Sequence, residues 1–149
     1  MNQERVLEIL RGERSSADLL KYLLLASDEI FETQMPLHEG NLKERVFEVI
    51  LQRFETLVFA KPFLHKLALF SIPQILNAPG EICSFLSLTQ KHIGDDFPET
   101  FKIALLGIFI KLYPTFLQDE TQDLGALMAE LDQTLNFFKP FVNLFLLKV

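Results

Sequence analysis

Several features that would indicate a particular chemistry are absent from this chain of 149 residues. Cys83 is the only cysteine, which excludes a disulfide within one chain and favours a reducing compartment, the cytoplasm. The three histidines, His38, His65 and His92, lie in separate segments, and no HExxH or CxxC motif accompanies them. P-loop, GxGxxG and GxSxG motifs are also missing. The sequence therefore predicts no metal, no cofactor and no enzymatic activity.

Clustered positive charge and long apolar runs are lacking as well. The 14 Lys and Arg residues are spread thinly and are outnumbered by 20 Asp and Glu residues, which gives a net charge of −6. Contacts to phosphate groups need clustered basic residues, so direct nucleic-acid binding by this chain is not expected. The start, MNQERVLEIL, lacks the apolar core of a signal peptide, and charged residues interrupt the longest apolar stretches at Lys111 and Lys139. No transmembrane segment is predicted.

Alternating strand patterns and Asn-Gly or Asp-Gly turns do not occur, whereas apolar residues recur at helical spacing throughout. The sequence predicts one all-α domain of about six helices over residues 1–149, with a short helix at about 2–11 preceding the main part, 15–149. Longer helices are expected at about 16–34, 80–92, 98–117 and 121–147, and Pro73 is expected to kink or split another. A further helix begins after Asn41, where Glu44 fits a capping box. Its apolar stripe faces a core, with Arg53 among the polar residues between the stripe positions: Phe47, Ile50, Leu51, Phe54 and Val58.

The two closing helices carry an unusual amount of apolar surface. The helix over 98–117 has two apolar rows, and the helix over 121–147 has a seven-residue repeat and becomes apolar nearly all round after residue 135. Exposing several Phe and Leu side chains would forfeit on the order of 10 kcal/mol. We therefore expect two copies to pack these helices into a four-helix bundle; burial within one chain and a lipid surface are the alternatives. The predicted interface comprises Phe101, Leu105, Ile108, Leu112, Leu124, Met128, Leu131, Leu135, Phe138, Val142 and Phe145.

Three segments resemble a known family. NLKERVFEVILQRFETL (41–57) is similar to the helix that opens the C-terminal domain of TetR/AcrR-type transcriptional regulators. DLGALMAELDQTL (123–135) resembles the final helix of those domains, and SSADLLKYLLLASDEIF (15–31) resembles their linker helix. The nearest subgroup has a C-terminal domain like the accessory lipid-binding protein of ubiquinone biosynthesis. The resemblance implies a ligand-binding and dimerisation domain of a regulator that senses a small apolar molecule, without a DNA-binding module in this chain.

The phenylalanine-rich interior has two interpretations. It is either an ordinary packed core or the lining of a cavity for an apolar ligand, with His65 and Tyr113 as orienting polar groups. The candidate pocket residues are Phe47, Phe54, Phe63, His65, Phe70, Phe85, Phe109 and Tyr113. A lipid- or isoprenoid-binding accessory protein is the alternative function. An enzyme that uses Cys83 with His92 as base is a weaker alternative, because a lone cysteine on an apolar helix is usually part of the core.

Overall fold

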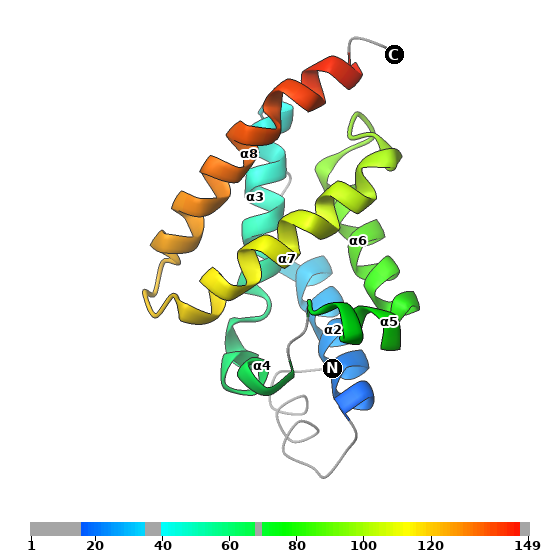
Figure 1. Ribbon diagram of the computed structural model, residues 1–149, viewed down its shortest axis with the longest axis vertical. Helices are drawn as coiled ribbons and strands as arrows, with labels where there is room; N and C mark the ends of the chain where they lie inside the picture. The colour runs from blue at the N-terminus through cyan, green and yellow to red at the C-terminus, as the bar shows by residue number, and fades with distance from the viewer. Residues whose placement is uncertain (1–15, 35–39, 68–69, 147–149) are drawn as a thin grey trace.

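The computed structural model describes residues 16–34, 40–67 and 70–146, and the helix predicted at 2–11 lies outside this part (Figure 1). All regular structure in the described segments is helical, which confirms the all-α prediction. Two short 3-10 helices, η1 (Val58–Ala60) and η2 (Glu99–Phe101), lead into α4 and α7. The α-helices are α2 (Ser16–Gln34), α3 (Leu42–Glu55), α4 (Lys61–Leu67), α5 (Ile72–Asn77), α6 (Pro79–Ile93), α7 (Lys102–Gln118) and α8 (Gly125–Leu146).

Local sequence signals place one helix start and one helix break where they were predicted. Asn41 caps α3: its Oδ1 accepts the backbone N–H of Glu44 at 2.9 Å, and its amide nitrogen donates to the Glu44 carboxylate at 3.1 Å. The helix predicted around Pro73 is split into α4 and α5. Pro73 stands in the first turn of α5, where its missing N–H costs nothing. The hydroxyl of Ser71 caps the same turn by accepting the N–H of Gln74.

The turn between α7 and α8 differs from the prediction, since α8 begins at Gly125 and not near residue 121. Asp119 organises this turn. One carboxylate oxygen accepts the backbone N–H of Thr121 at 3.0 Å, and the other accepts the N–H of Leu127, in the first turn of α8, at 2.9 Å. Thr121 also contributes to the start of α8, because its hydroxyl accepts the N–H of Gly125 at 3.0 Å.

Helices α3, α6 and α7 each contact at least three other α-helices. Helix α7 contacts α8, α6 and α4, while α3 contacts α6, α8 and α2. In Figure 1, α7 (yellow) spans the middle of the molecule, and the orange-to-red end of α8 extends past the end of α3 at the top of the view. The buried residues form one hydrophobic cluster that draws on α2, α3, α4, α6, α7 and α8, and the half-buried Ile75 of α5 packs against it. A single core therefore holds the bundle together.

One helical stretch of the described residues, Glu99–Gln118, is long and apolar enough to cross a membrane, judged by length and composition. A third of it, 33%, is buried inside the protein. The buried side is integral to the core, because Leu105, Phe109 and Leu112 on α7 are fully inaccessible to water. The high apolar content of α7 thus has a structural explanation on one side of the helix and none on the other.

Candidate functional site

The two apolar rows of α7 have different surroundings. The inner row, Leu105, Ile108, Leu112 and Phe116, is buried among the other helices of the chain. On the opposite side, Ile103 is 82% exposed and Ile110 is 37% exposed. With Gly107 and Pro114, which are also exposed, these residues recur at steps of four, three and four along the helix. We call Ile103, Gly107, Ile110 and Pro114 the outer stripe of α7.

Gly107 is unusual within the outer stripe. A glycine inside a helix costs roughly 0.5–1 kcal/mol relative to alanine, because it loses more conformational freedom on folding. A side chain at this position would meet no atom of the described chain within 4 Å, so no packing constraint inside the chain requires glycine. The backbone at Gly107 is therefore open to close approach from outside.

A surface groove of about 450 Å³ lies beside the outer stripe, between α4, α5 and α7. Its polar groups are His65, which is exposed on α4, the hydroxyl of Tyr113, and Ser71 and Gln118. The Tyr113 hydroxyl donates to the carbonyl of Leu64 at 3.2 Å, which fixes the ring at the groove floor. The apolar part of the lining consists of Leu64, Phe70, Ile110, Pro114 and Leu117. Ile110 and Pro114 belong to both the groove and the outer stripe, so the two features share one edge.

The structure brings three predicted pocket residues, His65, Phe70 and Tyr113, together in this groove. The others lie elsewhere. Phe54, Phe85 and Phe109 are fully buried in an aromatic cluster, whereas Phe47 and Phe63 are half-buried and pack against the hydrophobic core. Within the cluster, ring centroids lie 5.3 Å apart for Phe54 and Phe109 and 5.1 Å apart for Phe85 and Phe109. Rings at these distances are in contact, so their own atoms fill the space between them.

Most of the predicted interface residues are covered by the chain itself. Phe101 and Met128 are half-buried, and the remaining described ones are buried in the core: Leu105, Ile108, Leu112, Leu124, Leu131 and Leu135. The side chains of Phe138, Val142 and Phe145 lie outside the described residues. Among the described side chains of α7 and α8, the outer stripe and Phe137 of α8, which is 68% exposed, carry the exposed large apolar surface.

Arg53 corrects the prediction for α3, because it is fully buried and does not lie on the polar side. Its guanidinium carbon lies 3.8 Å from the ring centroid of Phe85 and 4.5 Å from that of Phe31. One guanidinium nitrogen forms an ion pair with Asp28 of α2 at 2.5 Å. The buried face of α3 is wider than the predicted stripe. Ile50, Leu51 and Phe54 are buried as predicted, and Val46, Val49 and Arg53 are buried beside them. Of the other two predicted positions, Phe47 is half-buried and Val58, which lies in η1, is exposed. The spacing of Val46, Val49 and Arg53 is the signal that could have revealed this burial.

Burial controls the electrostatics of this pair. It lowers the pKa of Arg53 to about 10, although the charge of Asp28 opposes the shift. It also raises the pKa of Asp28 above the ordinary 3.8, again against the effect of the partner. Asp28 lines a second groove, of about 310 Å³, between α2 and α6, which also contains Leu25 and Gly80. Since both charges are matched within the chain, the pair functions as a structural link between α2 and α3.

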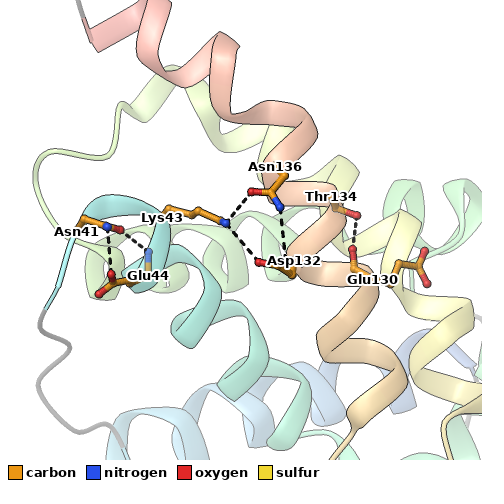
Figure 2. A network of polar contacts seen from close by, with 7 residues as sticks. All are labelled: Asn41, Lys43, Glu44, Glu130, Asp132, Thr134 and Asn136. Carbon is orange, nitrogen blue, oxygen red and sulfur yellow. Dashed lines mark hydrogen bonds and ion pairs between the residues drawn. The ribbon is translucent and has the colours of Figure 1, made fainter.

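A polar contact joins α8 to α3 (Figure 2). The ammonium group of Lys43 on α3 reaches Asp132 at 3.3 Å and Asn136 at 2.6 Å, both on α8. On the other side of α8, the hydroxyl of Thr115 on α7 donates to the carboxylate of Glu130. These contacts fix α8 between α3 and α7 up to the position of Phe137.

The weaker enzymatic hypothesis requires Cys83 and His92 to approach each other. Both residues lie on α6, nine positions apart, which corresponds to about 13.5 Å along the axis and to opposite sides of the helix. Cys83 is exposed, while the ring of His92 packs edge-on against Phe31 with centroids 4.9 Å apart. A nucleophile and its base must be within hydrogen-bonding distance, so these two residues do not form such a pair.

The fold and the site together define the chain as an all-α helical bundle with an apolar surface stripe and an adjoining groove. No model of a known protein family matches the chain, and no curated protein or solved structure matches it either. Within the described segments, no group of three or more His, Cys, Asp or Glu side chains could hold a metal ion.

Proposed function

We propose that this protein is a regulatory ligand-binding and dimerisation domain of the TetR/AcrR type, which senses a small apolar molecule. The observation that supports the proposal best is the shared edge of the groove and the outer stripe, formed by Ile110 and Pro114. A molecule bound in the groove would contact the same side of α7 on which the apolar surface is open. Ligand occupancy and self-association would then influence each other through α7.

The groove suits a mainly apolar ligand with one polar group. Its apolar residues would cover the body of the ligand, and His65, Ser71 and Gln118 would orient a hydroxyl, carbonyl or amide. Its volume of about 450 Å³ falls within the range of small-molecule sites.

Binding of the neutral fluorescent probe N-phenyl-1-naphthylamine tests the ligand-binding part. Leu117→Glu places a charge in the groove and is expected to weaken probe binding at least tenfold, because burying an unpaired carboxylate beside an apolar ligand is unfavourable. Leu25→Glu is the matched control: Leu25 is 55% exposed and lines the other groove, so this variant should bind the probe like wild type. Equal binding by all three proteins would refute the groove as the ligand site. Native mass spectrometry of protein purified without denaturant would identify a co-purified ligand.

The second candidate function is a lipid- or isoprenoid-binding accessory protein. The apolar composition of Glu99–Gln118 and the exposure of Ile103 favour it. Flotation with vesicles of neutral phosphatidylcholine separates the two functions. Recovery of the protein with the vesicles supports the accessory role, and a protein that remains in the aqueous fraction supports the regulatory one.

A further inference from the structure

We infer that a second copy of this chain packs on the outer stripe, so that α7 crosses the partner's α7 at Gly107 and the two helices run in opposite directions. The inference rests on the proposed function for the existence of a dimer and adds the place and direction of the contact. It differs from the predicted bundle, whose α7 row is already used by the core of each chain.

Gly107 is the first line of support. It is the sixth of the 17 residues of α7, it is exposed, and the described residues leave the space above it empty. A helix that crosses another helix at a glycine can approach its backbone closely, because no Cβ keeps the two apart. Ile103 and Ile110 flank the glycine and would pack against the partner on either side of the crossing point.

Charge complementarity determines the direction. If the helices were parallel and crossed at Gly107, Lys111 would lie beside the same lysine of the partner, which is unfavourable. In the antiparallel arrangement, Lys111 lies opposite the partner's Ile103. The partner's Glu99 lies four residues before that isoleucine, in the 3-10 helix η2 that leads into α7, which corresponds to about 7 Å along the axis. Both Lys111 and Glu99 are exposed, so they are free to form an ion pair across the contact.

A second copy fits the outer stripe better than a membrane does. From Ile103 to Pro114 the stripe extends about 16 Å, roughly half the hydrocarbon thickness of a bilayer. Lys111 lies beside it, and the opposite side of α7 is held in the core. The partner would also cover the groove edge at Ile110 and Pro114, which places the ligand site next to the contact between the two chains.

Disulfide cross-linking in a Cys83→Ser background tests the crossing point, since Cys83 is the only cysteine. Gly107→Cys, oxidised with copper phenanthroline, is expected to convert most of the protein into a covalent dimer, because the two residues face each other at the crossing. Gly80→Cys is the matched control. It also replaces an exposed helical glycine with open space above it, but on α6, and it should give no more dimer than the background protein.

Mixed cross-linking tests the direction and does not depend on the glycine variant. Ile103→Cys and Lys111→Cys, each four positions from Gly107, are expected to cross-link to each other in a mixture and only weakly with themselves. Strong cross-linking of each variant with itself, and weak cross-linking between the two variants, would overturn the antiparallel arrangement. A dimer in sedimentation that is not cross-linked through any of the three α7 positions would overturn the inference and leave the proposed dimer intact. A monomer in sedimentation would refute the inference and the proposed dimer, while the probe assay would still decide ligand binding.

Discussion

The junction of α2, α3 and α6 around Arg53 and the outer stripe of α7 break the usual rule of burial in opposite ways. The junction buries a charge among aromatic rings, and the stripe exposes isoleucine side chains to water. At the junction, Asp28 and two phenylalanines of the same chain compensate the buried charge. On the stripe, the described residues leave Ile103 82% exposed and cover Ile110 only in part, at 37% exposure. A buried charge or an exposed apolar side chain is thus a structural feature when residues of the same chain compensate it. It indicates an interface when they do not.

The two sides of α7 provide the largest expected difference. Phe109→Ala should lower the free energy of unfolding by about 4 kcal/mol, because it leaves a cavity at the centre of the aromatic cluster. Ile110→Ala, at the next position, should cost less than about 1 kcal/mol when the protein is diluted to its monomer. Urea unfolding at submicromolar concentration measures both variants. Comparable losses would mean that the outer side of α7 is packed within the single chain.

Removal of Asp28 tests whether this carboxylate compensates the buried charge of Arg53. Asp28→Ala should destabilise the fold by about 3 kcal/mol, because Arg53 would remain charged and buried without its partner. The double variant Asp28→Ala with Arg53→Met should recover most of this loss, since a buried pair replaced by apolar side chains is often neutral. Thermal unfolding of the two variants and wild type makes the comparison. A double variant no more stable than Asp28→Ala would contradict the assigned role of the pair.

Acid should affect the junction and the α7–α8 turn in opposite directions. Burial would raise the pKa of Asp119, but hydrogen bonds from Thr121 and Leu127 and the charge of Lys61 together bring that pKa below 3.8. The stabilisation from Asp119 is therefore present above pH 3.8 and lost as the pH falls through the lower folded-state pKa. The raised pKa of Asp28 has the opposite sign, because the folded state binds that proton more tightly, so protonation favours folding.

Urea unfolding between pH 6 and pH 3 tests this contrast. Asp119→Asn should cost about 1 kcal/mol at pH 6, where one of its accepting oxygens is lost, and the variant should lose less stability than wild type below pH 3.8. Asp28→Asn should show a steeper acid loss than wild type, because the group that gains on protonation is absent. If the free energy of unfolding changed with pH in the same way for wild type and both variants, neither carboxyl group would control the acid response.

The smallest expected effect concerns the link between α3 and α8. Lys43→Ala removes the contacts to Asp132 and Asn136, but these groups are partly exposed, and the expected loss is no more than about 0.5 kcal/mol. Lys91→Ala, on the exposed side of α6, is the control for loss of a surface lysine. Differential scanning calorimetry at low and at high salt compares them. A loss of more than about 1.5 kcal/mol for Lys43→Ala would assign a larger structural role to this contact.

The sequence predictions succeeded where the interacting residues are close together in the sequence and failed where they are far apart. The capping of α3 by Asn41 and the split at Pro73 follow from neighbouring residues, so they were predictable. The burial of Arg53 depends on Asp28 and Phe85, which are distant in sequence, and its charge favoured the polar side. The two rows of α7 could not be distinguished, because both are apolar and only the arrangement of α4, α6 and α8 decides which is buried. For the same reason, the sequence predicted the groove residues His65 and Tyr113 but grouped them with side chains of the core.

Sedimentation velocity of the wild-type protein and of Ile110→Glu at about 20 µM tests the central claim most directly. The account predicts that wild type sediments at about twice the mass of the 17.2 kDa chain. It also predicts that Ile110→Glu sediments as a folded monomer, because the new charge lies in the contact between the two copies. A wild-type monomer at this concentration, or an Ile110→Glu dimer as stable as wild type, would contradict the claim that a second copy covers the outer stripe.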